Sequence, residues 1–437
     1  MKRITIIGTG YVGLVSGAGI SEFGNAVTCV DIDQNKIDQL KSGKIPFYEP
    51  ELESLVKKNM AKGLLQFSSD VPGAIQNTDV IFIAVGTPQG NNGEAILDAV
   101  ESVTKTIGEN LNGYKIICTK STVPIGTGKK IENIIRSIKP NADYDYVSNP
   151  EFLREGAAVK DFLHPDRVVL GTRTSKAFDV MRDVYSPLYI NETPILSTSV
   201  ETAEMIKYAS NAFLALKISY INEIANLCEA VDADVHEVAR AMGFDGRISP
   251  KFLHPGPGYG GSCFPKDTQA LAVTGRKNKS PLLTVEAAIK TNASQKKRMV
   301  SKISQLLNND LDGKSVAVLG LAFKPQTDDV REAPSIVIIS QLVELGVNVR
   351  AYDPIAMENF KKYHGDIQYF KSWQKAVKDA DACIILTEWN EFRGMDLNEL
   401  KSLMKTPIVL DTKNILNMDK LDSLGFVFDN LGRKKTL

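Results

Sequence analysis

The hydrophobic positions of the chain follow two patterns that alternate along most of its length. Short apolar runs, bounded by glycines and polar residues, are typical of strands that are buried on both faces of a parallel sheet. Longer stretches between them carry apolar residues at i, i+3 and i+4, which predicts amphipathic helices. This alternation favours an α/β fold built on doubly wound, Rossmann-like sheets.

Apolar runs in the first part of the chain predict a first sheet, and the last run is expected to be its final strand. The runs lie at residues 4–8, 27–31, 79–85, 114–120 and 146–150. Polar turns follow two of them, at Gly86–Pro88 and Ser121–Pro124. Ligands of open α/β sheets bind beyond the carboxyl ends of the strands, so both turns are predicted to face a ligand.

The pattern changes near residue 199. Residues 201–231 keep helical spacing without glycine or proline, which predicts one long helix, and residues 281–307 predict a second. The α/β alternation then restarts, with strand-like runs at 314–320, 347–353, 382–387 and 407–411. This last part keeps only Gly320 of a glycine fingerprint, which predicts a nucleotide-like ligand there and not a second dinucleotide. We predict three domains: a Rossmann domain over 1–198, a central helical domain over 199–311 and a second Rossmann-like domain over 312–437.

Charge and composition narrow the class of protein. Lys+Arg and Asp+Glu both total 52, so no net field points to nucleic acid or to an anionic membrane as a partner. The first apolar run breaks at Gly8, and no later run supplies the roughly 20 apolar residues of a transmembrane helix. The cysteines are scattered and odd in number, which predicts a reducing, cytoplasmic location. The short basic tail at 432–437 is expected to be a solvated end.

The first apolar run leads directly into a glycine-rich turn. Gly8, Gly10 and Gly13 have GxGxxG spacing, a helical stretch follows, and the second run ends in the acid Asp31. Such glycines allow a tight turn and a close approach to pyrophosphate, and the acid binds ribose hydroxyls, so the segment predicts an NAD site. Lys36 is either a further ligand of this ribose or of a phosphate, or a solvated lysine.

The segment from Gly256 to Asp267 carries a candidate nucleophile. Its glycines let backbone lie close to a ligand, and Pro265 suits the first turn of a helix, which puts Cys263 at or just before a helix N-terminus. The positive end of the helix dipole favours ionisation of a thiol at that position. Asp267 follows at i+4, on the same face. The alternative interpretation is a buried cysteine beside a glycine-rich turn.

Two further pairs of polar residues have i, i+4 spacing. Glu151 and Glu155 would share a face if their segment is helical, which suits either a solvated helix face or acid–base catalysis. Lys207 and Asn211 lie in the long helix, as an ordinary polar stripe or as a pair that handles a proton and an oxyanion. With NAD and a thiol, these residues predict a dehydrogenase that takes an alcohol through an aldehyde and a thioester to an acid, consuming two NAD.

Five segments in the same order resemble the UDP-glucose/GDP-mannose dehydrogenase family over nearly the whole chain. The matching segments are Gly8–Gly13, Ser121–Pro124, Asn149–Gly156, Gly256–Asp267 and Gly320–Pro334. The Cys-Phe-Pro-Lys-Asp form at 263–267 and the last segment look like the bacterial-type UDP-glucose 6-dehydrogenases of that family. The resemblance implies oxidation of UDP-glucose to UDP-glucuronate with NAD as the cofactor.

The resemblance also implies roles for the matching residues. Cys263 is the expected nucleophile, Lys207 and Asn211 the expected oxyanion pair, and Asp267, Glu151 and Thr122 are expected around the hydrolytic water. The expected NAD-binding residues are Gly8, Gly10, Tyr11, Val12, Gly13, Asp31, Lys36, Thr87, Thr122, Glu155, Lys266 and Arg331. The expected UDP-sugar-binding residues are Glu151, Phe152, Leu153, Arg154, Glu155, Lys207, Asn211, Arg247, Phe252, Leu253, His254, Pro255, Gly256, Tyr259, Gly260 and Lys324.

Three points about partners and specificity stay open. Arg247 matches an arginine that reaches the substrate of a neighbouring subunit, which implies a homodimer or a higher homo-oligomer built on the helical domain. Lys413 stands where the family often has arginine, and loss of the bidentate fork leaves the choice of sugar open. The alternatives are the same chemistry on a UDP-N-acetylhexosamine or GDP-mannose, a one-step NAD-dependent hydroxyacid dehydrogenase that needs no thiol, and an NAD-sensing module without turnover.

Overall fold

The computed structural model describes residues 1–433. They divide into two compact units, Met1–Ser210 and a second that begins at Asn211. Each unit contains one sheet, and the boundary between the units falls inside the long helix α9 (Val200–Val231). The predicted α/β fold with two Rossmann-like sheets is confirmed. The end of the predicted solvated tail, at 434–437, lies outside the described residues.

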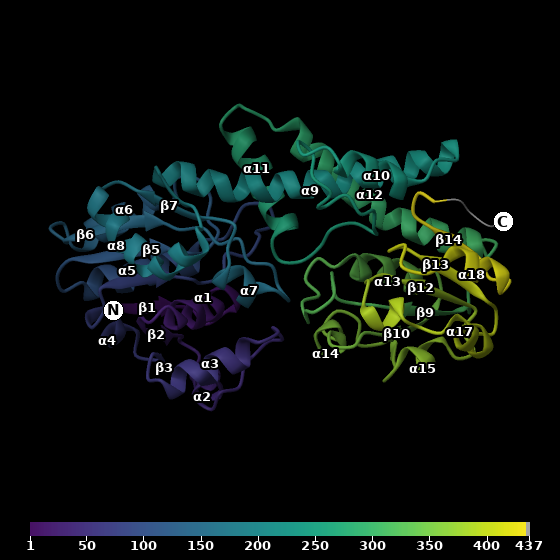
Figure 1. The fold of residues 1–437 in the computed structure, drawn as a ribbon, viewed down its shortest axis with the longest axis horizontal. Helices are drawn as coiled ribbons and strands as arrows, with labels where there is room; N and C mark the ends of the chain where they lie inside the picture. Colours follow the sequence, from purple (N-terminus) through teal and green to yellow (C-terminus); the bar gives the residue numbers. More distant parts are fainter. Residues whose placement is uncertain (434–437) are drawn as a thin grey trace. The chain divides into compact units, whose positions relative to one another are not determined.

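The first unit contains an eight-stranded sheet in the order β3-β2-β1-β4-β5-β6-β7-β8 (Figure 1). Its first six strands are parallel and have the 3-2-1-4-5-6 order of a dinucleotide-binding fold, whereas β7 joins β6 antiparallel. The strands are β1 (Arg3–Ile7), β2 (Ala26–Val30), β3 (Leu65–Ser68), β4 (Val80–Ile83), β5 (Lys115–Thr119), β6 (Tyr144–Ser148), β7 (Val168–Thr172) and β8 (Ile195–Thr198). The helices are α1 (Tyr11–Glu22), α2 (Gln34–Lys41), α3 (Leu52–Ala61), α4 (Val71–Gln76), α5 (Asp98–Asn110), α6 (Thr127–Ile138), α7 (Ala158–Leu163), α8 (Ser175–Val184) and a 3₁₀-helix at Ser186–Asn191.

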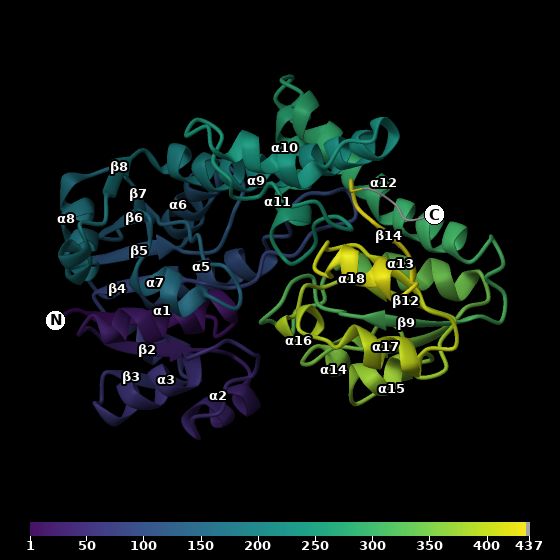
Figure 2. The same ribbon diagram turned by 45° about the vertical axis from the view of Figure 1, so that its right-hand side comes forward.

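Alternation along each strand sends side chains into two hydrophobic cores, one on each face of the sheet. In β1, Ile4 and Ile6 pack with α1, α2, α3, α7 and α8, whereas Ile7 packs with α4, α5 and α6. Figure 2 shows helices on both faces of this sheet. Because both faces are covered, the central strands are continuous apolar runs, and the sequence pattern could identify them.

The prediction that the run at 146–150 supplies the final strand was wrong. β7 and β8 extend the sheet beyond β6. β8 lies at the sheet edge, with two of its four residues exposed, so its sequence lacks a continuous apolar run. The opposite edge strand, β3, alternates buried and more exposed positions and was missed for the same reason.

Helices occupy most of the chain between the two sheets. They are α9, α10 (Val235–Gly243), α11 (Phe264–Lys277) and α12 (Leu283–Leu306). The long helix predicted over 201–231 and the second predicted over 281–307 are therefore confirmed, because α9 and α12 match them within two residues at each end. Within the part of the chain that the structure describes, no helix is both long and apolar enough to cross a membrane.

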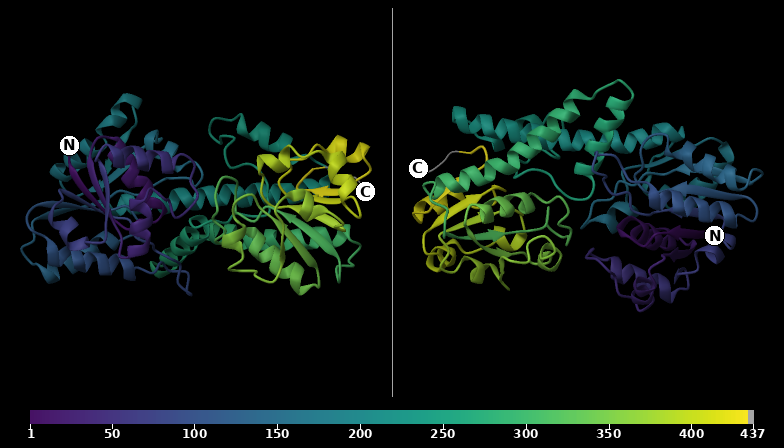
Figure 3. Two further views of the ribbon diagram at one scale, coloured as in Figure 1. Left: turned by 90° about the horizontal axis from the view of Figure 1, so that it is seen from below. Right: turned by 180° about the vertical axis from the view of Figure 1, so that it is seen from behind.

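The second unit repeats the parallel 3-2-1-4-5-6 order in a six-stranded sheet, β11-β10-β9-β12-β13-β14. Its strands are β9 (Ser315–Leu319), β10 (Asn348–Tyr352), β11 (Gln368–Tyr369), β12 (Ala382–Ile385), β13 (Ile408–Asp411) and β14 (Val427–Asn430). Its further helices are α13 (Pro334–Glu344), α14 (Met357–Phe360), α15 (Trp373–Val377), α16 (Asn390–Arg393), α17 (Leu397–Leu403) and α18 (Met418–Ser423). The residues Met299 and Ile303 of α12 pack into one core of this sheet, and Figure 3 shows α12 beside it.

The second sheet keeps the topology of a dinucleotide fold without its ribose-binding acid. Asp353 follows β10 as Asp31 follows β2, but its side chain is fully buried. Its carboxylate accepts hydrogen bonds from the amides of Leu321, Ala322, Ile355 and Ala356 and from the indole of Trp389. Because the chain itself uses these acceptors, Asp353 does not present them to ribose hydroxyls as the acid of an NAD site does.

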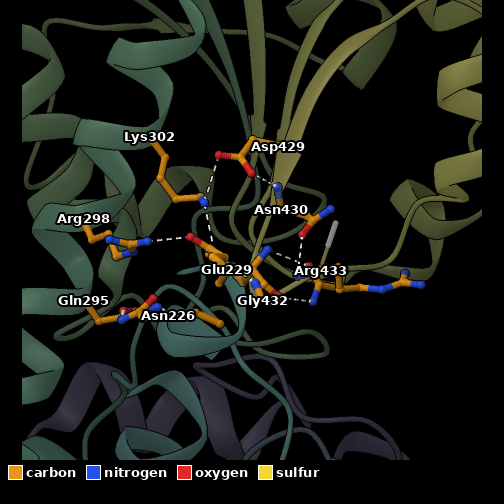
Figure 4. A network of polar contacts seen from close by, with 12 residues as sticks. Asn226, Glu229, Gln295, Arg298, Lys302, Asp429, Asn430, Gly432 and Arg433 are labelled. Atoms are coloured by element: carbon orange, nitrogen blue, oxygen red, sulfur yellow. Dashed lines mark hydrogen bonds and ion pairs between the residues drawn. The ribbon is translucent and has the colours of Figure 1, made fainter. Parts of the chain in front are cut away.

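A buried ionic network fastens the C-terminal strand to two helices of the second unit (Figure 4). The ammonium of Lys302 on α12 lies 3.0 Å from a carboxylate oxygen of Glu229 on α9 and 2.9 Å from one of Asp429 on β14. Arg298 pairs with the other oxygen of Glu229, and the amide of Gly432 donates to the first. One lysine therefore bridges two buried carboxylates from distant parts of the chain, and Arg298 supplies the second positive charge.

Candidate active site

The glycine-rich turn between β1 and α1 leaves the helix N-terminus open. A Cβ on Gly13 would lie 1.9 Å from the carbonyl oxygen of Gly8, and Gly8 itself has a φ of +102°. A Cβ on Gly10, in contrast, would meet nothing within 4 Å, and Gly10 caps α1 without a side-chain hydrogen bond. The turn thus fits a pyrophosphate on the first amides of α1, among them those of Tyr11 and Val12.

The acid that follows β2 is held in place by the same turn. Asp31 accepts hydrogen bonds from the amide of Thr9 at 2.9 Å and from its hydroxyl at 2.7 Å. The ammonium of Lys36 lies 3.1 Å from the same carboxylate oxygen, so Lys36 is paired and not simply solvated. Burial alone would raise the pKa of Asp31, but these bonds and the amide of Asp33 bring it below its ordinary value. The carboxylate of Asp31 is ionised, and its side chain is 14% exposed, so it can also accept hydrogen bonds from ribose hydroxyls.

Sequence reasoning missed Glu49, which joins two parts of the predicted NAD site. Its carboxylate accepts a hydrogen bond from the hydroxyl of Tyr11, and also from the amides of Gly156 and Ala158 at 2.6 and 2.8 Å. The turn before α7, which contains the half-buried Glu155, is thereby tied to α1. A single glutamate with no motif around it gives no signal in the sequence.

The two polar turns follow the carboxyl ends of β4 and β5, as predicted, and the structure shows that they contact each other. The hydroxyl of Thr87 donates to the carbonyl oxygen of Thr122 at 2.8 Å, and Ser121 donates to the carbonyl of Val85 at 2.7 Å. These bonds hold Thr122 at the edge of the sheet where the glycine-rich turn also lies.

The segment of Glu151 and Glu155 is not helical, so the condition for the two acids to share a helix face is not met. Residues 151–154 have no regular structure, and α7 begins only at Ala158. The side chain of Glu151 turns back instead and accepts the amide of Leu153 at 2.6 Å, which a helix would not allow. Its other oxygen lies 2.8 Å from the ammonium of Lys207, in a pair whose side chains are 5% and 4% exposed.

The pair of Glu151 and Lys207 brings two predicted catalytic residues into contact. Burial alone would raise the pKa of Glu151, but the charge of Lys207, its hydrogen bond and the amide of Leu153 outweigh burial. The pKa of Glu151 is therefore lower than usual, and the group is a carboxylate at neutral pH. A carboxylate beside an ammonium in a buried site can exchange a proton with a bound ligand.

The rest of the segment after β6 has more peripheral contacts. The guanidinium of Arg167, which the sequence had not singled out, stacks 3.6 Å from the ring centroid of Phe152. Arg154 is more than half exposed and makes a bidentate pair with Asp161. The amide of Leu153 is already bound to Glu151 within the chain.

Glu204, one turn before Lys207 on α9, is a second acid that sequence reasoning missed. It is 2% exposed and accepts the amides of Gly126 and Gly128 at 2.6 and 2.8 Å, at the start of α6. Burial raises the pKa of Glu204 to about 7, although the two amides oppose that shift. Its i, i+3 spacing from Lys207 was the available signal, because both belong to one polar stripe of a mostly apolar helix.

In the second unit, Cys263 is the N-cap of α11, as the position of Pro265 predicted. Its thiol is partly exposed and lies 3.5 Å from the hydroxyl of Ser262. Asp267, one turn later, is fully buried and its carboxylate accepts the side-chain amide of Asn211 at 2.7 Å and the ammonium of Lys266 at 2.6 Å. Four predicted site residues of this unit are therefore gathered at one helix N-terminus.

The glycines before Cys263 are required mainly by packing within the chain. A Cβ on Gly258 would lie 2.8 Å from Asn292, and one on Gly260 would lie 2.5 Å from the carbonyl of Glu332. Amide side chains hold the loop: Asn222 accepts the amide of Gly256, Gln295 donates to its carbonyl, and Asn292 bonds both backbone groups of Tyr259. The sequence had suggested that the glycines let the backbone approach a ligand. It did not predict that Asn222, Asn292 and Gln295 hold the loop.

The other residues predicted for the second unit are more dispersed. Leu253, Pro255 and Tyr259 are buried, His254 is exposed, and Phe252 has a φ of +65°. The ring of Phe264 contacts Phe252 and Tyr259 edge to face. Arg331 pairs with Asp329, Lys324 lies over the ring of Phe323, and Lys413 pairs with Glu388 at 2.8 Å. Arg247 is 90% exposed and pairs with Asp245.

Comparison with known proteins places this geometry in a family. Three family models match in order: the NAD binding domain of the UDP-glucose/GDP-mannose dehydrogenase family over residues 2–189, its central domain over 201–294 and its UDP binding domain over 317–418. The chain is 50% identical over 434 residues to the UDP-glucose 6-dehydrogenase of Rhizobium meliloti (strain 1021), covering 99% of both chains. It is 48% identical to one from Bacillus subtilis (strain 168), covering 99% of this chain and 94% of that one.

Solved structures give the same answer. The UDP-glucose dehydrogenase of the hyperthermophilic archaeon Pyrobaculum islandicum superimposes with a TM-score of 0.90 at 35% identity over 95% of both chains. The UDP-D-ManNAc dehydrogenase of Pyrococcus horikoshii superimposes with a TM-score of 0.87 at 26% identity over 99% of both. The order of the three domains, the identity along the full chain and the shared fold agree. The chain belongs to the UDP-glucose/GDP-mannose dehydrogenase family.

Proposed function

We propose that this protein is an NAD-dependent UDP-glucose 6-dehydrogenase, which converts UDP-glucose, two NAD and one water to UDP-glucuronate and two NADH. The observation that carries the proposal is Cys263 at the N-terminus of α11 with Asp267 one turn away. A one-step alcohol dehydrogenase has no use for a thiol there, whereas oxidation of an aldehyde to an acid needs a nucleophile. Relatives at 50% and 48% identity along the chain carry this activity in their names.

The cofactor is NAD, which accepts a hydride in each of the two oxidations. The open N-terminus of α1 would hold the pyrophosphate, and Asp31 would bind the adenosine ribose. The full set proposed to bind NAD is Gly8, Gly10, Tyr11, Val12, Gly13, Asp31, Lys36, Thr87, Thr122, Glu155, Lys266 and Arg331. We add Glu49, because it fixes both Tyr11 and the turn at 155–158.

In the first oxidation, we assign the substrate's primary alcohol to Lys207 and Asn211. One hydrogen of the Asn211 amide is directed at Asp267, which orients the second hydrogen for an oxyanion. Lys207 is held by Glu151 and supplies a positive charge to the same oxygen. The ammonium lowers the cost of the alkoxide character that develops as the proton leaves.

In the second oxidation, the thiolate of Cys263 adds to the aldehyde carbon and forms a thiohemiacetal. Loss of a hydride from that adduct gives a thioester, and water then displaces the thiol to release the acid. Asp267, Glu151 and Thr122 are the groups proposed around this water. Glu151 suits the role of base, because its pKa lies below the ordinary value and it is ionised at neutral pH.

The residues proposed to bind the UDP-sugar follow from the resemblance to the family. We assign UDP-sugar binding to Glu151–Glu155, Lys207, Asn211, Arg247, Phe252–Gly256, Tyr259, Gly260 and Lys324, the positions for which the resemblance implies this role. We propose that the chain has three domains: 1–198 binds NAD, 199–311 carries the catalytic thiol and 312–437 binds the UDP-sugar. Limited proteolysis that cuts only at these boundaries would support the division, and cuts inside a proposed domain would contradict it.

The experiment that tests the function is a count of NADH formed per sugar nucleotide consumed. We expect two NADH for each UDP-glucose, and much slower turnover of UDP-N-acetylglucosamine and GDP-mannose at the same concentration. One NADH per substrate would establish a one-step dehydrogenase and overturn the thioester mechanism. Preferred turnover of another sugar nucleotide with two NADH would keep the chemistry and correct the substrate. Binding of NAD without turnover of any member of the panel would indicate a sensing module.

We further propose that the protein is a homodimer joined through α9. Phe213, Tyr220 and Leu227 follow one another at intervals of seven residues and are 61%, 45% and 57% exposed, so they form an uncovered apolar stripe on one helix face. A second copy would cover such a stripe, and the exposed Arg247 would then be free to reach the partner's substrate. A cytoplasmic location, drawn from the isolated cysteines, also remains a proposal that cell fractionation would test.

Replacing both Phe213 and Leu227 with glutamate should shift the protein from dimer to monomer in sedimentation experiments and lower its activity. Two charges in an apolar interface are costly unless they are paired. The control is Leu345→Glu, which changes an exposed leucine of the second unit outside α9 and should leave the dimer intact. A wild-type protein that is fully active as a monomer would contradict the proposal.

A further inference from the structure

A second buried lysine lies near the catalytic carboxylate. Lys120 directly follows β5 and is 5% exposed. Its ammonium donates to the side-chain oxygen of Asn149 at 3.1 Å and to the hydroxyl of Tyr185 at 3.3 Å. The rings of Phe162 and Tyr185 lie 5.9 and 5.7 Å from it. Among the described residues, no carboxylate is within ion-pair distance of this ammonium, although burial of a charge normally demands such a partner.

The contacts of Lys120 determine the position of the turn that carries Glu151. Asn149 accepts both Lys120 and, at 2.6 Å, the hydroxyl of Tyr185, and it donates to the carbonyl of Val169 at 2.9 Å. The backbone amide of Asn149 donates to the carbonyl oxygen of Thr119 at the end of β5. Glu151 follows two residues later, so the anchor that Lys120 completes holds the start of the segment that carries Glu151.

Charge links the two groups as well. Burial lowers the pKa of Lys120 to about 8, with the charge of Lys207 acting in the same direction and the negative charge of Glu151 opposing it. At neutral pH the lysine is therefore mainly an ammonium. For Glu151, burial raises the pKa, whereas Lys207 and the Leu153 amide lower it. Lys120 also lowers the pKa of Glu151, by a smaller amount. The neighbouring Tyr185 is fully buried, and its pKa is raised, so it stays neutral.

In the proposed mechanism, the ammonium of Lys207 is shared between Glu151 and the substrate during part of the catalytic cycle. Lys207 neutralises Glu151 at 2.8 Å in the structure, but its ammonium is also the group assigned to the substrate oxygen. When that ammonium is shared with an oxyanion, a carboxylate that is 5% exposed would tend to take up a proton. A protonated Glu151 could not act as a base toward water.

We propose that Lys120 is a positioning residue for the hydrolysis step: it anchors the Asn149–Glu151 turn and supplies the second positive charge that keeps Glu151 a carboxylate while Lys207 serves the substrate. Lys120 itself touches neither the substrate nor the water in this assignment. The inference rests on the proposed function, because it gives Lys120 a purpose only if Glu151 takes a proton from the hydrolytic water.

The test is the pH dependence of kcat for UDP-glucose oxidation in Lys120→Met and Lys120→Gln. Methionine removes both the charge and the hydrogen bond, whereas glutamine removes the charge but can still donate to Asn149. Without the charge, the carboxylate form of Glu151 loses stabilisation, and its protonation moves to higher pH. We expect the acid limb of the profile to move upward by about one pH unit in both variants. Lys120→Arg, which keeps the charge, should restore the limb toward its wild-type position.

Tyr185→Phe is the matched control, because it removes one bond to Asn149 and leaves the charge of Lys120 in place. Its acid limb should stay at the wild-type position even if kcat falls. Acid limbs that superimpose on the wild type in both neutral variants would overturn the proposal, whatever the change in kcat. Failure of both neutral variants to fold, judged by thermal unfolding, would make the role purely structural and would overturn it equally.

The proposed function can fail separately. If the wild type forms one NADH per UDP-glucose, the hydrolysis step itself is absent and the function is wrong before any variant is made. If the wild type forms two NADH and the acid limb does not move in the variants, only the assignment of Lys120 is wrong.

Discussion

Replacing Cys263 with alanine should reduce the conversion of UDP-glucose to UDP-glucuronate by on the order of 10⁴-fold or more, the size of loss that follows removal of a covalent nucleophile. The thiol sits at the N-cap of α11, where the helix dipole favours the thiolate. Without it, an aldehyde has no route to a thioester. Product analysis by chromatography, together with the count of NADH, measures the effect.

The first oxidation does not involve the thiol, so the alanine variant should still reduce the aldehyde intermediate with NADH. That activity would show that the variant is folded and binds both ligands. Cys228→Ala is the matched control, because Cys228 is a buried cysteine of the same unit that the mechanism does not use. It should still form two NADH per substrate. Undiminished acid formation by the Cys263 variant would rule out the thioester mechanism.

Replacing Lys302 with methionine should lower the free energy of unfolding by about 3–5 kcal/mol, the cost of leaving a buried charge without its partner. Lys302 is 3% exposed and pairs with both Glu229 and Asp429, each 5% exposed. The methionine would keep most of the buried volume, so the loss reports the charges more than a cavity. Urea unfolding at pH 7, followed by circular dichroism, measures the change.

The acid dependence of this effect has a definite sign. Burial raises the pKa of Glu229, but Lys302, the Gly432 amide and Arg298 bring it below its ordinary value. A lowered pKa adds stability that is present above the unfolded-state pKa and is lost as the pH falls through the folded-state value. The difference between wild type and Lys302→Met should therefore shrink in acid. Lys361→Met breaks an exposed pair with Glu358 and should cost less than about 1 kcal/mol; an equal loss in both variants would contradict the prediction.

The candidate site illustrates where sequence reasoning succeeds. Proline at position 265 and a glycine loop before it place a cysteine at a helix N-terminus by local rules alone, and the structure has it there. The GxGxxG turn and Asp31 are equally local, because strand, turn, helix and acid lie within one βαβ unit. The spacing of Lys207 and Asn211 required only that 201–231 be a helix.

Local rules fail where a side chain finds its partner far away in the chain. The i, i+4 spacing of Glu151 and Glu155 left open whether their segment is helical. The contact of Glu151 with Lys207, 56 residues later, and its own bond to Leu153 belong to a non-helical conformation. Glu49 bonds to groups 38 and 107 residues from it. The neighbouring residues do not predict such contacts, because the contacts form only when the sheet brings separate segments to one edge.

The sequence by itself determined the alternation of strands and helices, the NAD turn and the helix that begins after Cys263. Each follows from short-range sterics and from the burial of apolar runs on both faces of a parallel sheet. Only the tertiary structure decided which buried charges face one another. It brought Lys120 to the side chain of Asn149 and Lys302 between two carboxylates. It also gave Asp353 five hydrogen-bond donors from the chain itself, where the acid of an NAD site would bind ribose hydroxyls. The free energy of a buried charge depends on its neighbours in space, and sequence spacing does not specify those neighbours.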